Sequence, residues 1–211
     1  MIRKAIRVGS DANAADLFTI VFDLEETLTC VKENDEGKPD GWMSVIKSES
    51  KQRMKLGIYY RPFLTDCLKR LKALGCELIV WSSGATEYAN KLISSIDKEN
   101  EIFDMRLFKD NCYITSKGLC IKDIRIINRP LHKCIIVDNH AYSFGFQLEN
   151  GVLVLPFTAD STDTEMLTLT EYLIYLMSLE DFRPFNKKHF KYEVYEKEST
   201  FEGLTKKLLK S

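Results

Sequence analysis

Three polar residues stand where chemistry could take place: Asp23, Ser82 and Asp138. Each follows an apolar run that predicts a buried β-strand, and these runs cover residues 17–21, 76–81 and 134–137. In an open α/β sheet, ligands bind in the crevice beyond the carboxyl ends of the strands. An aspartate in that crevice can act as a nucleophile and carry a phosphoryl group. The sequence therefore indicates phosphoryl transfer with Asp23 as the nucleophile.

The three strand ends meet only if the strands lie in one parallel sheet. Strand and helix patterns alternate along the chain, which predicts a largely parallel sheet covered by helices on both faces. In such a sheet the three ends lie at one edge, so residues over a hundred positions apart share one crevice. A single polar residue after a strand is more often only the start of a turn, but three together favour a functional site.

Phosphoryl transfer also needs cations that neutralise the phosphate oxygens and a group that passes a proton to the leaving oxygen. The hydroxyl of Ser82 can donate a hydrogen bond to phosphate. Lys122 is the candidate cation, because it lies between two predicted core elements. Spacing alone leaves a second interpretation of Lys122 equally open, namely a solvated lysine on the surface.

Oxygen ligands for a divalent cation gather at the same strand ends. Mg²⁺ is a hard ion that prefers carboxylate, amide and carbonyl oxygens and keeps some of its water. We therefore expect a Mg²⁺ site formed by Asp23, the backbone carbonyl of Glu25, Asp138 and Asn139.

The bulk properties of the chain exclude several classes of protein. Its 211 residues suit one α/β domain, and the net charge of −1 creates no strong field toward nucleic acid or a membrane. No apolar run has the length of a membrane span, and no signal peptide is visible near Met1. The six cysteines form no C-x-x-C pair, so we expect buried free thiols rather than a zinc site. These features predict an intracellular monomer, nuclear or cytoplasmic, that binds no nucleic acid directly.

The predicted elements divide the chain into three parts. Residues 1–16 are polar and without a clear period, and we expect them to form a flexible lead-in. Residues 17–180 hold the predicted domain, with a β-hairpin insertion at about 43–60 after a surface loop. Residues 181–211 form a tail or a helix. Within the domain, helices are predicted over 61–74, 86–96 and 162–179, the last one starting with a capping box.

Several ordered motifs carry a resemblance to a known family. Segment 23–28 reads Asp-Leu-Glu-Glu-Thr-Leu, and segment 136–139 reads Ile-Val-Asp-Asn. Segment 82–84 is Ser-Ser-Gly with Tyr-Ala at 88–89, and segment 121–123 is Ile-Lys-Asp. In order and spacing, these motifs resemble those of the small C-terminal-domain phosphatases, the NLI-interacting-factor-like branch of the haloacid dehalogenase (HAD) superfamily. The agreement runs from about Phe18 to Leu179, which is most of the chain.

The resemblance implies a HAD-like fold: a doubly wound, mostly parallel sheet flanked by helices, with a small β-hairpin insertion. It also implies a Mg²⁺-dependent phosphatase that acts on phosphoserine or phosphothreonine in proteins. The best-known substrate of the family is the repetitive tail of RNA polymerase II. Its partner would therefore be a phosphorylated protein or peptide.

The family pattern also assigns roles to individual residues. Asp23 would be phosphorylated, and Asp138 and Asn139 would organise the metal. The side chains that hold the substrate would be Ser82, Ser83, Lys122 and, together with the hairpin insertion, Tyr88. Ala85 stands where a larger apolar side chain is usual at the substrate groove, so the resemblance does not imply specificity for the polymerase tail.

Glu25 departs from the family, whose second aspartate at this position is the general acid and base. A glutamate keeps the carboxyl group and a similar ordinary pKa. Its arm is longer by one methylene group, which moves the acid by roughly 1 Å, and a misplacement of that size can cost about a hundredfold in rate.

Three interpretations of Glu25 remain open. Neighbours such as Ser82 and Gly84 could accommodate it, which would give a phosphatase of lowered activity. Hydrolysis could instead be so slow that the chain is a pseudophosphatase that binds phosphoproteins. The glutamate could also be an introduced substitution that disables the site. A translocase subunit, a third class of function, would need a membrane anchor and a targeting segment, and we find neither in the sequence.

Overall fold

The computed structural model describes residues 17–33, 37–46, 52–195 and 201–209. The predicted lead-in at 1–16 lies outside these ranges. The strands are β1 (Thr19–Phe22), β2 (Thr29–Glu33), β3 (Gly41–Ile46), β4 (Arg53–Tyr60), β5 (Glu77–Trp81), β6 (Met105–Leu107), β7 (Tyr113–Ile114), β8 (Cys120–Ile121), β9 (Cys134–Asp138) and β10 (Gly151–Leu153). The helices are α1 (Leu64–Ala73), α2 (Thr86–Ile96), α3 (Glu165–Met177), α4 (Arg183–His189) and α5 (Phe201–Leu208).

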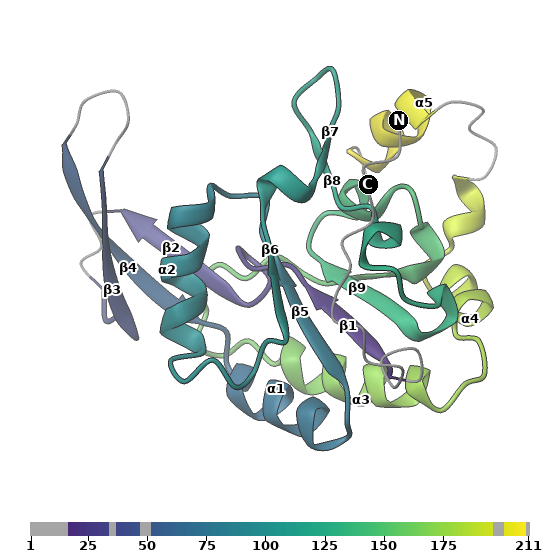
Figure 1. Ribbon diagram of the computed structural model, residues 1–211, viewed down its shortest axis with the longest axis horizontal. Coiled ribbons are helices and arrows are strands. Elements are labelled where there is room, and N and C mark those ends of the chain that lie inside the picture. Colours follow the sequence, from purple (N-terminus) through teal and green to yellow (C-terminus); the bar gives the residue numbers. More distant parts are fainter. Residues whose placement is uncertain (1–16, 34–36, 47–51, 196–200, 210–211) are drawn as a thin grey trace.

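A five-stranded parallel sheet forms the centre of the fold, with strand order β10-β9-β1-β5-β6 (Figure 1). Strand β1 lies between β9 and β5, so the order along the sheet reverses on either side of it. This arrangement confirms the predicted doubly wound, mostly parallel sheet. It also places a crevice at the carboxyl ends of the central strands, where such sheets bind their ligands.

Both faces of the sheet are covered, which explains why its strands are apolar without alternation. Successive side chains of a strand point to opposite faces. Ile20 and Phe22 pack with apolar residues of α1, α2 and α3. Val21 packs on the other face with a 3₁₀ segment at Ile124–Ile127 and with residues near the carboxyl end of the described chain. The buried core thus holds the strand ends rigidly in place.

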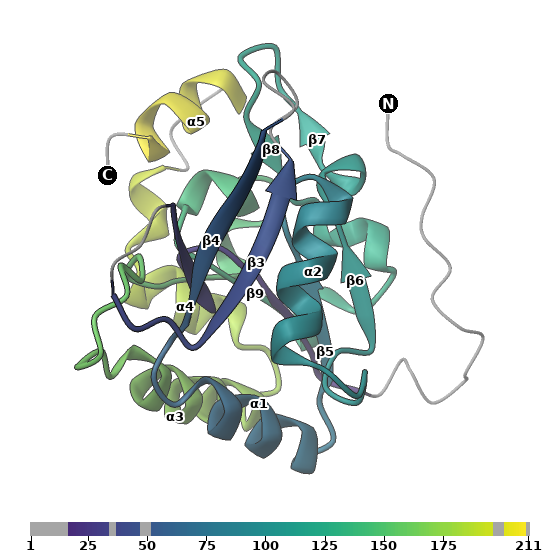
Figure 2. The ribbon, with the colours of Figure 1, turned by 90° about the vertical axis from the view of Figure 1, so that its left-hand side faces the viewer.

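A second sheet of three antiparallel strands, in the order β2-β4-β3, projects beside α2 (Figure 2). Strands β3 and β4 confirm the predicted hairpin insertion, and the residues between them at 47–51 lie outside the described part of the chain. The surface loop predicted before this hairpin is short, because residues 32 and 33 belong to β2 and pair with β4. The strand was missed because its outer half is polar and exposed.

The helices follow the predictions with differences at their first turns. Helix α2 matches the predicted range, whereas α1 begins only at Leu64. The capping box predicted for α3 does not form, since the Thr162 hydroxyl donates to the Asp160 carboxylate instead. Asp163 accepts the backbone N–H of Glu165 at 2.9 Å and so takes over the capping role.

Beyond residue 180, the chain continues along the sheet. The buried side-chain amide of Asn186, in α4, donates to the carbonyls of Glu149 and Gly151, both at 3.1 Å. Helix α4, which follows residue 180, thus packs against the domain. The domain boundary at residue 180 stays a prediction. None of the helices in the described ranges is both long and apolar enough to cross a membrane. None of the six cysteines, all of which lie in the described ranges, forms a disulfide, and four of them are buried.

Candidate active site

Three predicted site residues meet at the carboxyl edge of the parallel sheet. Phe22 is in register with Val137 of β9 and with Val80 of β5, so the residues that follow these strands are neighbours. The backbone N–H of Asp23 donates to the carbonyl of Val137 at 2.9 Å, which extends the pairing to the site itself. The prediction that Asp23, Ser82 and Asp138 share one edge is confirmed.

Lys122 lies between the two carboxylates of this edge. Its ammonium group is 2.5 Å from Oδ1 of Asp23 and 2.7 Å from Oδ2 of Asp138. Lys122 is only 1% exposed, so the interpretation as a solvated surface lysine is wrong. Burial opposes the charged form of Lys122, but the carboxylates of Asp138 and Asp23 outweigh it and raise its pKa above the ordinary value. Lys122 is therefore a fixed positive charge next to the candidate nucleophile.

The negative charge of the two carboxylates exceeds the positive charge of Lys122 in this cluster. Burial raises the pKa of Asp23 above its ordinary value, the Asp138 carboxylate adds to the rise, and Lys122 opposes it. One ammonium group thus faces two buried carboxylates. Such a cluster favours the arrival of a further cation, which would lower the cost of keeping both carboxylates ionised.

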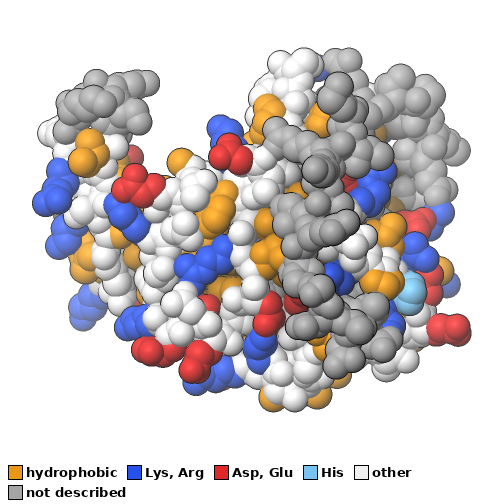
Figure 3. All heavy atoms as spheres, in the orientation of Figure 1, with side chains coloured by type: hydrophobic (Ala, Val, Ile, Leu, Met, Phe, Trp, Pro, Cys, Tyr) orange, Lys and Arg blue, Asp and Glu red, His pale blue; other side chains and the backbone are white. Residues whose placement is uncertain are grey.

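A polar cavity of about 240 Å³ opens beside the carboxylates. It is lined by Asp23, Glu25, Glu26, Ser83, Cys120, Asp138, Asn139, His140, Tyr142 and Ser143. On the molecular surface, a hollow lies between the three-stranded sheet and the β7–β8 hairpin, on the side toward which β1 and β5 run (Figure 3). The candidate nucleophile is therefore buried at its base but borders a space that a small anionic group could enter.

The two predicted serines differ in their surroundings. Ser82 is fully buried, and its hydroxyl oxygen accepts the backbone N–H of Gly84 at 2.9 Å. Ser83 lines the cavity, whereas Ser82 does not. The turn after β5 thus presents Ser83 to the cavity. Ser82 stabilises that turn through its hydrogen bond with Gly84.

Glu25 lies at the cavity in a defined orientation. The hydroxyl of Tyr88 donates to Oε1 of Glu25 at 2.8 Å. A Cβ atom placed on Gly84 would lie 3.3 Å from Oε2 of Glu25 and 3.1 Å from Oγ of Ser82, closer than ordinary contact allows. Burial raises the pKa of Glu25, which favours its protonated form more than in water. The missing side chain at position 84 therefore leaves room for the longer arm of the glutamate.

A buried arginine holds the loop that carries Glu25. Arg61 is 1% exposed, pairs with both carboxylate oxygens of Asp163 at 3.0 and 2.9 Å, and donates to the carbonyl of Thr27 at 3.2 Å. The sequence marked Arg61 only as the start of a helix. A buried arginine needs a partner, but sequence spacing does not show that its partner lies a hundred residues away, at the start of α3.

The predicted metal ligands line the same cavity, and their chemistry fits Mg²⁺. They are two carboxylates, one side-chain amide and one backbone carbonyl, all of them oxygen donors. The Asn139 amide is already oriented, because its Nδ2 donates to Glu26 at 3.0 Å and its Oδ1 lies 2.9 Å from Nδ1 of His140. Within the described ranges, no three His, Cys, Asp or Glu side chains are grouped so as to bind a metal by themselves. A cation at Asp23 and Asp138 would therefore depend on carbonyl, amide, water or phosphate oxygens as well.

Sequence reasoning missed much of the cavity wall. Cys120, His140, Tyr142 and Ser143 line it as well. Tyr142 and Ser143 belong to a 3₁₀ turn at Ala141–Phe144 that folds back toward Asp138. Their closeness to Asp138 in sequence was the available signal, but the direction of a short turn cannot be read from residue types.

The predicted substrate groove has a counterpart beside the hairpin insertion. An open hollow between β3 and α2 is lined by residues that include Trp42, Met43 and Lys91. Tyr88 is not part of its lining and points instead to Glu25. The structure thus separates Tyr88 from this hollow and brings it into contact with the candidate acid.

Comparison with known proteins adds independent information. Residues 18–183 match the family model described as NLI interacting factor-like phosphatase. CTD small phosphatase-like protein 2 of Dictyostelium discoideum is 32% identical over 173 residues, which are 82% of this chain and 30% of that protein. The human carboxy-terminal domain RNA polymerase II polypeptide A small phosphatase 2 is 29% identical, over 77% of this chain and 58% of that protein. The chain thus spans less than two thirds of the length of these relatives.

A solved structure supports the fold. The fission yeast RNA polymerase II CTD phosphatase Fcp1 superposes with a TM-score of 0.56 and 17% sequence identity, and the match covers 93% of this chain and 62% of that one. At this identity the likeness establishes a common fold and no more.

Proposed function

Because the chain belongs to the NLI interacting factor-like phosphatase family, we propose that it is a Mg²⁺-dependent protein serine/threonine phosphatase that works through an aspartyl phosphate. One observation carries the proposal: the ammonium group of Lys122 is buried between the carboxylates of Asp23 and Asp138 at the edge of a polar cavity. A nucleophile, a fixed cation and oxygen ligands for a metal are the parts that phosphoryl transfer needs.

In the first step, a carboxylate oxygen of Asp23 attacks the phosphorus of the bound phosphoserine. The bond between phosphorus and the serine oxygen breaks, and Glu25, as a carboxylic acid, gives its proton to that oxygen. The products are the free serine hydroxyl, an aspartyl phosphate on Asp23 and the Glu25 carboxylate. The raised pKa of Glu25 supports this role, because the acid must be protonated when the leaving group departs.

In the second step, the Glu25 carboxylate takes a proton from a water molecule, whose oxygen attacks the phosphorus of the aspartyl phosphate. The acyl phosphate bond breaks, which releases inorganic phosphate and restores the Asp23 carboxylate and the protonated Glu25. Lys122 and Ser83 stabilise the charge on the phosphate oxygens in both steps.

Mg²⁺ would be held by Asp23, the carbonyl of Glu25, Asp138 and Asn139, and it would supply positive charge for the equatorial phosphate oxygens. Lys122 keeps the Asp23 carboxylate in place through its ion pair and prevents the two carboxylates from moving apart. The Asn139 amide is held by Glu26 through Nδ2 and by His140 through Oδ1.

The substrate is a phosphorylated protein segment, and the polymerase tail is one candidate because the name of the human relative refers to RNA polymerase II. We place the protein in the nucleus or the cytoplasm, where such segments occur, and expect a monomer. Activity is lower than with an aspartate at position 25, since the longer arm changes the position of the acid.

A second candidate function has its own observation. The hydroxyl of Tyr88 already occupies Oε1 of Glu25, so the carboxyl group could be too strongly held to exchange protons with the substrate. In that case the site would bind phosphorylated protein with Mg²⁺ and release no phosphate, as a pseudophosphatase does.

One assay separates the two functions. The protein is incubated with p-nitrophenyl phosphate and with phosphoserine peptides, with and without Mg²⁺, and phosphate release is measured. A phosphatase gives Mg²⁺-dependent release that Asp23→Asn reduces by roughly 10⁴-fold or more, because the nucleophile is lost. Phosphopeptide binding without release above background indicates the pseudophosphatase. Release that survives in Asp23→Asn would contradict the aspartyl-phosphate mechanism.

A further inference from the structure

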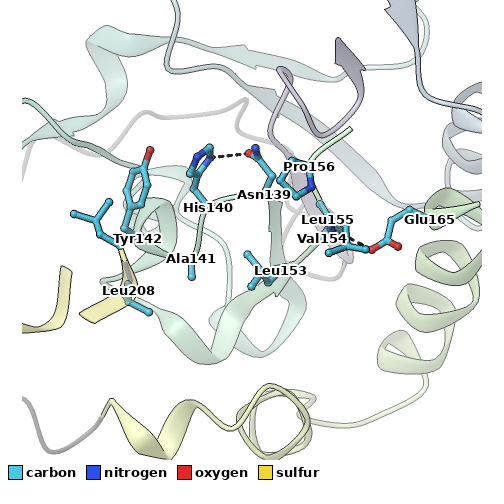
Figure 4. Close-up of a pocket in the computed structure, with 11 residues that line it drawn as sticks. Asn139, His140, Ala141, Tyr142, Leu153, Val154, Leu155, Pro156, Glu165 and Leu208 are labelled. Carbon is cyan, nitrogen blue, oxygen red and sulfur yellow. Dashed lines mark hydrogen bonds between the residues drawn. The ribbon is translucent and has the colours of Figure 1, made fainter. Parts of the chain in front are cut away.

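A second cavity, of about 430 Å³, lies directly beside the candidate active site (Figure 4). We call it the flanking groove: its apolar side includes Leu153, Leu155 and Leu208, and its polar side includes Asn139, His140 and Tyr142. In Figure 4, Asn139 and His140 lie side by side, with Tyr142 beyond them and Leu208 at one end. The groove is lined by more apolar than polar surface.

The flanking groove and the catalytic cavity share a wall. Asn139, His140 and Tyr142 line both spaces. The wall is fixed, because Nδ1 of His140 lies 2.9 Å from Oδ1 of Asn139 and the backbone N–H of His140 donates to Asp138 at 2.8 Å. A ligand whose phosphate enters the catalytic cavity therefore has its next covalent neighbours beside the groove.

The apolar side of the groove is unusually open to solvent. Leu155 is 70% exposed and Leu153 is 38% exposed. Both lie at the carboxyl end of β10, the strand next to β9, and thus at the same sheet edge as Asp23. Exposed apolar surface that borders a polar cavity is typical of a binding surface, since the cost of its hydration is recovered on binding.

We propose that the flanking groove binds a large apolar side chain of the phosphorylated protein substrate, one or two residues from the phosphoamino acid. This inference rests on the proposed function and adds a substrate class to it. An extended peptide advances about 3.3 Å per residue, and the two spaces have Asn139, His140 and Tyr142 in common, so we assign the groove to a residue close to the phosphoserine in sequence. The ligand is therefore a phosphopeptide with a leucine-like or aromatic neighbour, bound on the side of β10 rather than in the hollow beside β3.

The test uses paired fluorescent phosphoserine peptides that carry Leu or Ala at the two positions on either side of the phosphoserine. Binding is measured by fluorescence anisotropy with Mg²⁺, and hydrolysis by phosphate release. The Leu peptide at the preferred position should bind about ten times more tightly than its Ala partner, as expected for a side chain that fills an apolar pocket. Leu155→Ser should bring this ratio close to one, because it replaces the exposed wall of the groove with a hydroxyl.

Leu167→Ser is the matched control, since Leu167 is 46% exposed on α3 and does not line the groove. It should keep the ratio of the unmodified protein. Equal binding of the Leu and Ala peptides at all four positions, or an unchanged ratio in Leu155→Ser, would overturn the inference. So would dimerisation in size-exclusion chromatography that Leu155→Ser abolishes, because a second copy would then occupy the groove. Absence of hydrolysis with a preserved binding ratio would contradict the phosphatase function and leave the groove supported.

Discussion

Two clusters of buried charge lie at opposite ends of the same strands. At the amino ends of β1 and β5, Glu77 accepts two hydrogen bonds from the guanidinium group of Arg129, at 2.7 and 2.9 Å, and one from the Thr19 hydroxyl at 2.6 Å. At the carboxyl ends, the ammonium group of Lys122 lies between the carboxylates of Asp23 and Asp138. The first cluster pairs one positive charge with one negative charge, whereas the second has one positive charge and two negative ones.

Burial of charge alone therefore does not identify the candidate site, since the charged side chains of both clusters are at most 9% exposed. The pair of Glu77 and Arg129 is bidentate and balanced, and such a pair holds the scaffold. The cluster around Lys122 has an excess of carboxylate and borders a cavity. A cluster with excess negative charge that opens to a cavity can bind a cation. This difference distinguishes the candidate active site from the ion pair that only stabilises the fold.

Lys122→Met should give the largest effect, because it removes the cation from both carboxylates. We expect phosphate release to fall by roughly 10²–10³-fold, and the free energy of unfolding to fall by about 3–5 kcal/mol. Chemical denaturation and a phosphate-release assay measure the two effects. Mg²⁺ should restore part of the stability, since the carboxylates would then bind the ion more strongly. A variant with full activity would show that the cluster around Lys122 is only scaffold.

Arg129→Met should change stability alone. The substitution leaves the Glu77 carboxylate buried without its partner, at a cost of about 3 kcal/mol in the free energy of unfolding. Glu77 and Ser82 lie at opposite ends of β5, roughly 15 Å apart, so the rate per folded molecule should not change. Arg125→Met is the control, because its pair with Asp123 is exposed and contributes little. A loss of rate that is not explained by unfolding would break the proposed distinction between the clusters.

Glu25→Asp should raise the rate of phosphate release, by up to about a hundredfold, because it restores the shorter arm of the family's acid. Stability should change little, since the position is only partly buried. The comparison is made with the same peptides under saturating Mg²⁺. An unchanged or lower rate would mean that the contacts of Glu25 already place its carboxyl group correctly.

Gly84→Ala should have the smallest effect and should depend on residue 25. With Glu25 present, the added methyl group crowds Oε2 of the glutamate, and we expect the rate to fall severalfold. With an aspartate at position 25 the contact with Oε2 is relieved, while that with Oγ of Ser82 remains, so the two substitutions should be coupled by about 0.5–3 kcal/mol in a double-mutant cycle. Additive effects would show that Gly84 does not serve the longer arm.

The sequence predicted the parts of the site that depend on strand ends. Asp23 and Asp138 were found because a polar residue after a buried run marks the carboxyl edge of a parallel sheet. Lys122 was found by its position between core elements and by the family resemblance, while its burial was visible only in the structure. Residue order thus predicts which segments meet at an edge, but not how their side chains pair.

The remaining wall of the site depends on packing that residue types do not encode. The contact of Tyr88 with Glu25 joins α2 to the loop after β1, and the role of Arg61 depends on a partner at the start of α3. Tertiary contacts decided these two cases. The capping box predicted at Thr162 was wrong for a local reason, because the Thr162 hydroxyl donates to Asp160 and Asp163 caps the helix instead.

The central place of β1 has a consequence for how the protein is made. Thr19 pairs with Cys134 on one side and with Glu77 on the other, so β1 waits for partners that are synthesised later in the chain. Pairings between such distant segments make folding slow and leave unpaired strand edges open to aggregation in the meantime. The nascent chain therefore depends on the late arrival of β9, and a truncated product that stops before this strand would carry the Asp23 segment without a binding site and would be a natural client for chaperones.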